Sequence, residues 1–446
     1  MKGKKFMLPK EFLEEMKDIL KEDYDLYARS TDDEPFRGIS VNRLKTDEKI
    51  IGALPFEVKK TPFYKDGYYI PCDEKGIGNT PFHSGGAFYV QEPSAMSAVT
   101  LLDVCQNDKI LDLCAAPGGK SAQIASCLNN TGLIWSNEVV RNRAQILLSN
   151  FERMGISKGI VSSCYPEVLC SKLEGYFDKV LVDAPCSGEG MFRKNPEAVL
   201  EWSREHTVSC AERQLSILRS AAKAVKSGGI LVYSTCTFSY CENEGVIKKF
   251  LEENPDFEQC EIDGHFGRKT ELPCAVRITP IEGGEGHFAA KLRRKGENVT
   301  DSCFQTAKDK KQDTLLKTAL KELENIFYEV PKGEYNIIND KLYIMPENLP
   351  DMRGLGVIRA GIFVGEFKKN RFEPSHALFM SAKPENIRRI LKADDDKAKK
   401  FLSGMELDSG CQNGYTAVVY GNIIIGFGKT ADSRLKNKYP KGLRIK

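Results

Sequence analysis

Short apolar runs alternate with helical stretches between about Lys109 and Arg294, and this alternation constrains the fold of the chain more than any other feature. The runs predict five buried strands, at Lys109–Cys114, Leu133–Glu138, Gly159–Ser163, Phe177–Asp183 and Gly229–Thr235. Helices are predicted after a glycine turn through Leu128, from about Arg141 to Met154, and from about Ala211 to Val225. Such alternation is typical of an α/β fold with a mostly parallel, doubly wound sheet and helices on both faces.

The segments around this core predict further parts. Two apolar runs, Cys274–Ile281 and His287–Arg294, are joined by a glycine-rich turn and predict an antiparallel hairpin at the sheet edge. The chain has 446 residues, so two to four domains are expected. A helix from Pro9 to Glu22 opens the region before the core. The polar, lysine-rich segment Lys295–Gln312 has no apolar periodicity, which predicts an exposed linker.

The last third of the chain, from about Asp313, predicts a smaller region of mixed helices and strands. It contains a helix, several strands separated by glycines, and a further helix near Glu385–Leu391. The runs Thr416–Tyr420 and Ile423–Phe427 are separated only by Gly421-Asn422, which strongly indicates a β-hairpin.

Composition argues against several classes of protein. Fourteen cysteines at irregular spacing, with no signal peptide, predict free thiols in a reducing compartment. There is no CxxC pair, and the five histidines lack metal-like spacing, so no metal site is expected. No apolar run approaches the roughly 20 residues that span a bilayer, so a cytoplasmic protein without membrane contact is expected. The net charge of +3 is nearly neutral, so nucleic-acid contacts must come from local basic patches.

A glycine turn, Pro117-Gly-Gly-Lys-Ser121, connects the first strand to a helix and presents backbone N–H groups and a helix dipole to an anionic ligand. A dinucleotide, a nucleotide phosphate or the carboxylate of S-adenosylmethionine would suit it. The turn matches neither GxGxxG nor GxxxxGK[ST], which disfavours the phosphate ligands. Glu138 closes the second strand, where an acid can accept hydrogen bonds from two ribose hydroxyls. The alternative is that Glu138 is a charge at a helix N-terminus and the glycines form a plain turn.

Two cysteines stand where an apolar strand gives way to a polar loop. Asp183-Ala-Pro-Cys186 follows the fourth strand, and Ser234-Thr-Cys236 ends the fifth. Ligands of doubly wound sheets bind at the carboxyl ends of the strands, so Asp183, Cys186 and Cys236 are expected to converge beside the cofactor. Most of the other cysteines are expected to fill space in the core.

A thiolate, a second thiol and a carboxylate beside a methyl donor suit methylation of carbon-5 of cytosine, which is a poor nucleophile. Attack of a thiolate on carbon-6 makes carbon-5 enamine-like, so that it accepts the methyl group. A carboxylic acid near ring nitrogen 3 stabilises the developing charge, and a second group assists the release of the methylated base. A thiol with a pKa of about 8.5 needs help to ionise, which Lys120 or a helix N-terminus can supply.

Five motifs, in order along the chain, resemble those of the Sun/nucleolar-protein family of RNA cytosine-5 methyltransferases. They are Gln91-Glu-Pro-Ser-Ala-Met96, Leu111-Asp-Leu-Cys-Ala-Ala-Pro-Gly-Gly-Lys-Ser121, Asp183-Ala-Pro-Cys-Ser-Gly-Glu-Gly190, Ser234-Thr-Cys236 and Gly286-His-Phe-Ala-Ala-Lys291. Ser187–Lys194 and Ser433–Pro440 resemble the bacterial RsmF-like ribosomal RNA branch of that family. The resemblance covers most of the chain and implies a class I Rossmann-like methyltransferase sheet with small N-terminal and α+β PUA-like C-terminal domains.

The resemblance also implies a role for each matching residue. Cys236 would be the nucleophile, and Cys186 would assist product release. Asp183 would lie beside both the cofactor, S-adenosylmethionine, and the base. The methionine end of the cofactor would be surrounded by Cys114, Ala115, Ala116, Pro117, Gly118, Gly119 and Lys120, and its ribose would be bound by Glu138.

One position departs from the family pattern. The family often has an acid shortly after the third strand that binds the adenine amine, whereas Ser162–Pro166 contains none. The adenine is therefore expected to be held by backbone groups or by stacking on Tyr165.

RNA contacts are expected at two places. The stretch Ser433–Lys446 carries six lysines and arginines, no acid and one interleaved aromatic residue, Tyr439. Basic side chains bind phosphate and aromatic rings stack on unpaired bases, although a basic tail can also be merely solvated. The residues expected to bind RNA are Arg434, Lys436 and Lys438 in this stretch, with Arg193 and Lys194 at the mouth of the active site.

Together, these patterns predict a modular enzyme. The expected parts are an N-terminal RNA-recognition region (1–95), a methyltransferase core (96–294), a basic linker (295–312), a first C-terminal domain (313–378) and a PUA-like RNA-binding domain (379–446). The substrate favoured by the resemblance is 16S ribosomal RNA, free or in a small-subunit assembly particle, with transfer RNA as an alternative, and a monomer is expected.

Three other functions remain open on the sequence. A DNA cytosine-5 methyltransferase would use Cys186 as its nucleophile. An amino-group methyltransferase usually has an Asp/Asn-Pro-Pro-aromatic loop where Asp183-Ala-Pro-Cys186 stands. A non-catalytic RNA-binding factor in ribosome assembly would not need the pair of cysteines.

Overall fold

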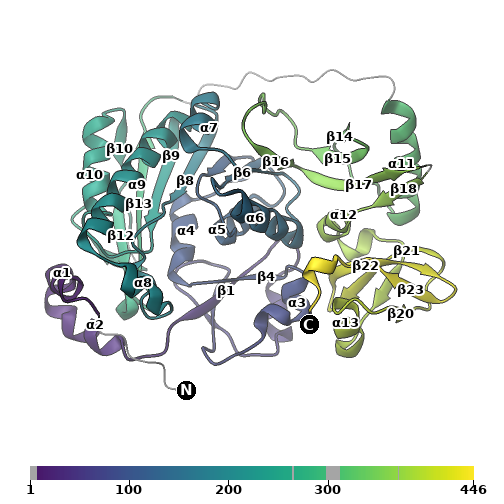
Figure 1. Ribbon diagram of the computed structural model, residues 1–446, viewed down its shortest axis with the longest axis horizontal. Helices are drawn as coiled ribbons and strands as arrows, with labels where there is room; N and C mark the ends of the chain where they lie inside the picture. The colour runs from purple at the N-terminus through teal and green to yellow at the C-terminus, as the bar shows by residue number, and fades with distance from the viewer. Residues whose placement is uncertain (1–7, 264–265, 298–311, 370, 446) are drawn as a thin grey trace.

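The computed structural model describes residues 8–263, 266–297, 312–369 and 371–445 (Figure 1). A large mixed sheet forms the centre of the molecule, the N-terminal region lies at one end of it, and two smaller sheets of the last third lie at its side. Most of the expected linker 295–312 falls outside the described residues.

The central sheet contains all five predicted strands, and they pair in parallel. They are β5 (Lys109–Asp112), β6 (Leu133–Asn137), β7 (Gly159–Ser162), β8 (Phe177–Asp183) and β9 (Val225–Thr235). Their order in the sheet is β9-β8-β5-β6-β7. Strands before β8 are added on one side of β5 and later strands on the other, and a ligand is expected at the loops of this switch point between β5 and β8.

The predicted antiparallel hairpin extends the sheet beyond β9. Strand β13 (His287–Arg294) pairs with β9 on one side and with β12 (Ala275–Ile278) on the other. Two short strands, β11 (Arg268–Lys269) and β10 (Phe257–Gln259), complete this end of the sheet, so the edge itself is formed by β11.

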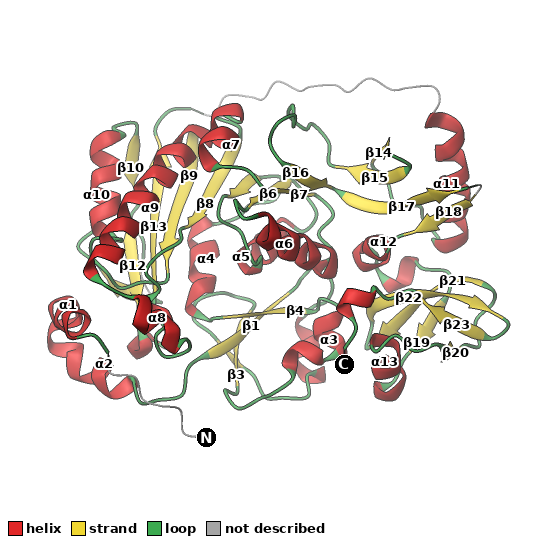
Figure 2. Cartoon of the chain, in the orientation of Figure 1, coloured by secondary structure: helices red, strands yellow, loops and turns green. Residues whose placement is uncertain are grey.

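Helices cover both faces of the sheet, as predicted (Figure 2). One face buries residues of α7 (Pro166–Lys172), α9 (Arg204–Ala224) and α10 (Glu244–Glu253), and the other buries residues of α4 (Ser97–Leu102), α5 (Gly119–Leu128) and α6 (Arg141–Met154). Neighbouring residues of a strand alternate between the two cores: Leu111 packs under the first group of helices and Ile110 under the second.

Two element boundaries differ from the prediction. Helix α9 begins at Arg204, about two turns earlier than expected, because the Ser203 side chain accepts a hydrogen bond from the His206 N–H and caps it. Strand β9 begins at Val225, where its backbone pairs with Phe177 of β8. Most residues of both extensions are polar or glycine, which hides the extensions from apolar periodicity.

The N-terminal region packs against the core. Its first helix, α1 (Lys10–Leu20), ends slightly before the predicted Glu22 and is followed by a 3-10 turn, Lys21–Asp23, and by α2 (Tyr24–Ser30). The Phe12 ring of α1 meets Phe192 and Trp202 edge to face. A four-stranded antiparallel sheet follows, in the order β2 (Lys59–Lys60), β3 (Gly67–Ile70), β1 (Arg37–Val41), β4 (Phe88–Gln91), with α3 (Pro81–Ser84) before β4.

The last third contains two small sheets. The first is formed by β14 (Glu334–Ile338), β15 (Lys341–Met345), β17 (Ile362–Lys368) and β18 (Arg371–Pro374), flanked by α11 (Gln312–Ile326) and α12 (His376–Ser381). The second runs β19 (Ile390–Lys392), β21 (Gly414–Tyr420), β22 (Ile423–Ala431), β23 (Arg434–Asn437), β20 (Leu407–Asp408), with α13 (Asp395–Leu402) beside it. The predicted hairpin through Gly421-Asn422 joins β21 to β22.

The helix predicted near Glu385–Leu391 is wrong. Pro384–Asn386 forms only a 3-10 turn, and Ile390–Lys392 is strand β19, parallel to β21. The buried Ile387 and Leu391 are spaced as on a helix, but pairing with β21 satisfies the backbone of this segment instead.

One strand of the last third joins the central sheet, which the sequence analysis did not predict. Strand β16 (Val357–Ala360) lies between β15 and β17 in sequence, yet it pairs antiparallel with β7 at the edge of the central sheet. The last third of the chain therefore contributes a strand to the core.

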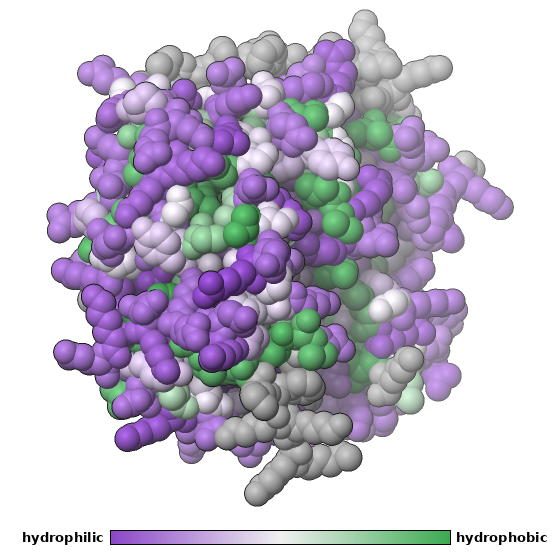
Figure 3. Space-filling model, turned by 60° about the vertical axis from the view of Figure 1, so that its left-hand side comes forward, coloured by the Kyte–Doolittle hydropathy of each residue, from purple (hydrophilic) through white to green (hydrophobic). Residues whose placement is uncertain are grey.

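Among the residues that the structure describes, no helix combines the length and the apolar character needed to cross a membrane. On the face drawn in Figure 3, hydrophobic side chains occur in small groups among hydrophilic ones.

Candidate active site

The carboxyl ends of β8 and β9 bring the predicted catalytic residues together. Asp183 pairs with Ser234 across the two strands, and Cys236 follows the last residue of β9. The Sγ atoms of Cys186 and Cys236 are 3.3 Å apart. The Lys120 Nζ atom, from the start of α5, lies 2.8 Å from Asp183 Oδ2. Two thiols, a carboxylate and an ammonium group thus form one cluster.

Asp183 and Lys120 form an ion pair that is largely withdrawn from solvent. Burial raises the pKa of Asp183, but the Lys120 ammonium outweighs it, and a hydrogen bond from Ser234 Oγ helps to hold the pKa below its ordinary value. Burial lowers the pKa of Lys120, but the Asp183 carboxylate outweighs it, so this pKa is raised. Both residues therefore carry their charges at neutral pH.

The two thiols are not equivalent. The hydrogen bond with Cys236 and burial raise the pKa of Cys186 well above its ordinary value, so this thiol stays protonated. The Lys120 ammonium lies close enough to Cys236 to interact with it electrostatically. The two thiols thus share one hydrogen bond, and the Lys120 ammonium adds a positive charge beside Cys236.

Buried carboxylates fix the two loops that follow Cys186 and Cys236, a role that the sequence analysis did not assign. The Glu242 side chain accepts hydrogen bonds from the Ser187 N–H and from Gln214. The Glu189 side chain accepts from the Phe238 N–H and from the Trp202 indole. Glu189 lies within a quoted motif, but motif position alone does not reveal that its side chain turns inward.

A cavity of about 650 Å³ opens beside this cluster and has a volume typical of small-molecule sites. Asp183, Cys186 and Cys236 line one end of it. The remainder is lined by Leu113, Cys114, Ala116, Glu138, Val139, Val140, Arg143, Tyr165, Pro166, Glu167, Ala184, Pro185, Arg213, Ser216, Ile217 and Ser220.

The loop that leads into the glycine turn borders this cavity. Cys114 and Ala116 border the space. Gly118 has a φ of +115°, and a Cβ there would approach Leu147 Cδ1 to 2.9 Å, so a glycine is required. The turn ends at the first residue of α5, Gly119, where free backbone N–H groups suit a carboxylate.

The far end of the cavity combines an acid with an apolar rim. Glu138 Oε1 accepts a hydrogen bond from the Val140 N–H, and Oε2 pairs with Arg143 at 3.1 Å. These bonds fix a buried carboxylate that keeps lone pairs for hydroxyl groups. Val139, Val140 and the exposed Tyr165 border the space beyond it. This donor set fits S-adenosylmethionine, which carries a carboxylate, a ribose diol and an adenine. In the part of the chain that is described, no group of three or more potential ligands could hold a metal ion.

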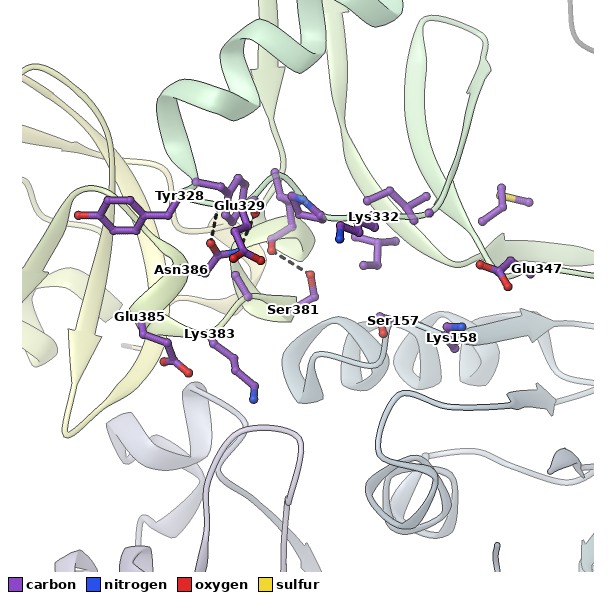
Figure 4. A pocket seen from close by; sticks show the side chains of 18 residues that line it. Ser157, Lys158, Tyr328, Glu329, Lys332, Glu347, Ser381, Lys383, Glu385 and Asn386 are labelled. Carbon is purple, nitrogen blue, oxygen red and sulfur yellow. Dashed lines mark hydrogen bonds between the residues drawn. The ribbon is translucent and has the colours of Figure 1, made fainter. Parts of the chain in front are cut away.

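A larger cavity of about 770 Å³ lies elsewhere, where the core meets the last third of the chain (Figure 4). Ser157 and Lys158 border it from the core, and most of its remaining lining belongs to the first C-terminal sheet and its surroundings. Its charged side chains are three lysines and three glutamates: Lys158, Lys332, Lys383, Glu329, Glu347 and Glu385. Balanced charge and the lack of a cysteine, a histidine or an aspartate in its lining leave the cavity at the strand ends as the site for chemistry.

The structure corrects one expected RNA contact and encloses the aromatic residue of the basic stretch. Arg193 is not presented at the mouth of the site: its Nη2 donates to the carbonyls of Asp33 and Glu34, and its guanidinium lies 3.6 Å from Glu285. Tyr439 is buried against Phe401 and His376, so its ring is not available for stacking on a base.

The other expected RNA contacts differ in exposure. Lys194 is only partly exposed, and burial lowers its pKa. Arg434, Lys436 and Lys438 are exposed along β23 and just after it.

Four family models match the chain. Residues 99–293 match a model described as 16S rRNA methyltransferase RsmB/F. Residues 8–93 match the N-terminal domain of 16S rRNA methyltransferase RsmF, residues 320–381 its first C-terminal domain, and residues 388–445 its PUA domain.

Curated relatives match over nearly the full length. A ribosomal RNA small subunit methyltransferase F from Vibrio vulnificus is 32% identical over 467 residues, covering 98% of this chain and 97% of the relative. One of the same name from Aeromonas salmonicida is 32% identical over 431 residues, covering 91% and 90%.

Solved structures match about two thirds of the chain. A methyltransferase homologue from Pyrococcus horikoshii has a TM-score of 0.57 and 29% identity, covering 64% of this chain and 95% of the other. NSun6 from Pyrococcus horikoshii, solved with SFG, has a TM-score of 0.58 and 24% identity, covering 65% and 99%, which supports the fold.

Proposed function

Because the chain belongs to the RsmB/F family of 16S rRNA methyltransferases, we propose that it methylates carbon-5 of a cytosine in 16S ribosomal RNA with S-adenosylmethionine as the methyl donor. The observation that carries the choice of carbon-5 is the 3.3 Å contact between Cys186 and Cys236 beside the Lys120–Asp183 ion pair. Methyl transfer to an amino group needs no thiol, whereas attack on a pyrimidine ring needs one.

Cys236 is the nucleophile. Its thiolate forms a bond to carbon-6 of the base, and the electron density that reaches carbon-5 makes that atom accept a methyl group. Lys120 favours the thiolate, and the protonated Cys186 donates a hydrogen bond to it. After methylation, the carbon-5 proton passes to solvent water, the double bond re-forms and Cys236 leaves as a thiolate, which the neighbouring Cys186 thiol stabilises by a hydrogen bond.

Asp183 and Lys120 have different roles towards the ring of the base. Asp183 is a carboxylate in this ion pair rather than the carboxylic acid expected from the sequence, so it accepts hydrogen bonds from the base instead of donating one. Lys120 is the member of the pair that carries protons, and its ammonium can stabilise negative charge that develops on the ring.

The cavity of about 650 Å³ is the cofactor site. When bound there, S-adenosylmethionine supplies an electrophilic methyl group. The loop Cys114–Lys120 and the N-terminus of α5 hold its methionine carboxylate, Glu138 accepts hydrogen bonds from its ribose, and Val139, Val140 and Tyr165 pack against its adenine.

RNA binds along the exposed residues Arg434, Lys436 and Lys438 of the PUA-like domain, with Lys194 as a further contact nearer to the site. The proposed division of the chain keeps the ranges predicted from the sequence (1–95, 96–294, 295–312, 313–378 and 379–446). In this division, β16 of the first C-terminal domain is also a strand of the core sheet. The protein acts as a cytoplasmic monomer without a metal, on ribosomal RNA or a small-subunit assembly particle.

Covalent trapping tests the reaction. The purified protein is incubated with S-adenosylmethionine and a 16S RNA fragment that contains 5-azacytidine, and the protein–RNA adduct is resolved on a denaturing gel. Cys236→Ala should abolish the adduct, whereas Cys186→Ala should retain it because only release is impaired. Cys260→Ala, a partly buried thiol outside the site, is the matched control.

The opposite pattern, with the adduct lost only in Cys186→Ala, would assign the nucleophile to the Pro-Cys cysteine, as in a DNA cytosine-5 methyltransferase. No adduct and no labelled methyl on any RNA with the unaltered protein would favour a non-catalytic factor.

A further inference from the structure

Residues 346–361, called the strap here, leave the first C-terminal sheet after β15 and return to it at β17. Between these strands the strap lies along the edge of the methyltransferase sheet, where β16 pairs with β7 (Figure 2). The pairing joins Val357 to Ser162 and Ala360 to Ile160, and the Gly361 N–H donates to the Gly159 carbonyl at 2.8 Å. The strap is thus a part of the core sheet that the sequence places in another domain.

The strap also supports the segment that follows β7. Leu355 is fully buried in the same core cluster as Leu169 of α7. Lys172, at the end of α7, donates to the Arg353 carbonyl at 2.8 Å, and the Tyr176 hydroxyl donates to the Asn348 carbonyl at 3.3 Å. The strap therefore contacts the loop and helix 163–176 from the side opposite to the cofactor cavity.

Ser163 connects the strap to the cavity. Its N–H donates to the Gly356 carbonyl at 2.9 Å, and its Oγ donates to the Val139 carbonyl at 3.0 Å. Val139 borders the cavity on one side, and Tyr165, two residues after Ser163, borders it on the other. One residue in contact with the strap is therefore hydrogen-bonded to one part of the apolar rim and lies two residues before the other.

Gly356 allows no side chain at this contact. Its φ is +59°, and a Cβ there would lie 2.2 Å from the Ser163 carbonyl oxygen. The segments around Gly356 and Ser163 would have to separate by about 1 Å to reach ordinary contact. A gap of this size loses a quarter to a half of the dispersion energy of an atom pair. The rim of the cavity moves with Ser163.

We propose that the strap is a positioning element of the cofactor site, and that Gly356 acts through Ser163 to set the adenine rim formed by Val139 and Tyr165. The inference rests on the proposed assignment of this cavity to S-adenosylmethionine. Ser162–Pro166 offers no carboxylate to the adenine amine, and the acid that follows in the cavity lining, Glu167, lies on the same segment that the strap contacts. The position of this segment therefore contributes to the affinity. The affinity of this chain for its cofactor then depends on a strand from the first C-terminal domain.

Isothermal titration with S-adenosylhomocysteine and with 5′-methylthioadenosine tests the inference on the full-length protein. Gly356→Ala should raise the dissociation constants of both ligands about tenfold, which corresponds to about 1.4 kcal/mol. Both should weaken together because they share the adenosyl end. The control Gly76→Ala has the same left-handed conformation (φ +75°) with nothing within 4 Å, and should stay within about twofold of the unaltered protein.

A readout of turnover separates positioning from loss of fold. In Gly356→Ala the KM for S-adenosylmethionine should rise while kcat at saturating cofactor stays near that of the unaltered protein. If this variant does not fold, Ser163→Ala takes its place: it removes the bond to Val139, keeps the N–H bond to Gly356, and should weaken S-adenosylhomocysteine several-fold.

Unchanged affinity in folded Gly356→Ala, or in Ser163→Ala where the first variant does not fold, overturns the role of the strap. Failure of the unaltered protein to bind S-adenosylhomocysteine would instead overturn the proposed cofactor site.

Discussion

Replacement of Asp183 by asparagine tests whether the ion pair at the active site is as buried as the structure indicates. Asparagine keeps the shape and can still accept the hydrogen bond from Ser234 Oγ, but it leaves the Lys120 ammonium without a counter-charge. The Lys120 side chain is 11% exposed and that of Asp183 31%. Removal of one partner of a fully buried pair lowers the free energy of unfolding by about 3–5 kcal/mol. Because this pair is partly exposed, Asp183→Asn should lower it by about 2–3 kcal/mol.

The sign of the pH dependence follows from the direction of the two pKa shifts. The pKa of Asp183 is lowered in the folded state, so its stabilisation is complete above the ordinary value near 3.8 and is lost as the pH falls through the folded value. The pKa of Lys120 is raised, so its stabilisation is complete below about 10.5 and is lost only at higher pH. The difference between the two proteins should therefore be constant from about pH 5 to 9 and shrink below about pH 4.

Urea unfolding, followed by tryptophan fluorescence and circular dichroism at pH 7 and at pH 3.5, measures this difference. Asp351→Asn is the control, because the Asp351–Arg353 pair is exposed and its loss should cost no more than about 0.5 kcal/mol. A cost of Asp183→Asn at pH 7 no larger than that of the control would refute the buried ion pair. A large cost that stays the same even at a pH below the folded pKa of Asp183 would show that packing, not charge, produces it.

Two further predictions concern ligands. Glu138→Gln keeps the shape of the side chain but removes the charge that strengthens hydrogen bonds accepted from the ribose hydroxyl groups. The dissociation constant of S-adenosylhomocysteine, measured by isothermal titration, should therefore rise about tenfold, and a rise of less than twofold would remove Glu138 from the ribose site. Replacement of Arg434, Lys436 and Lys438 by glutamine should lower the salt dependence of RNA binding. The slope of log binding constant against log salt concentration should change by about two to three, with an unchanged Tm. Arg193→Gln should instead lower the Tm and leave that slope unchanged, because the Arg193 guanidinium binds carbonyls inside the protein.

The core could be predicted from the sequence because its signals are local. Each parallel strand is a short apolar run, and a strand buried on both faces needs no partner to be recognised as one. The convergence of Asp183, Cys186 and Cys236 follows from a general rule about the carboxyl ends of parallel strands. Neither inference required knowledge of contacts between distant residues.

The errors have the opposite origin. Arg193 and Tyr439 belong to residue types that often face solvent or nucleic acid, and nothing in their neighbours along the chain shows that they are enclosed by Glu285 and by Phe401. The segment around Ile390 has helical spacing, but its backbone is satisfied by β21, more than twenty residues away. In each case the deciding partner is remote in sequence.

Strand β16 shows why domain borders drawn on a sequence mislead about function. Val357–Ala360 lies inside the segment that matches a first C-terminal domain, yet its hydrogen bonds are to β7, almost two hundred residues earlier. Antiparallel pairing at a sheet edge requires only that the backbone of the edge strand is exposed. The sequence of β7 therefore does not indicate that another strand covers it. The coverage has a chemical consequence, because the residue after β7 joins this added strand to the rim of the cofactor cavity. An active site assembled in this way cannot be separated from the C-terminal domain without exposing the edge of the sheet on which its cofactor depends.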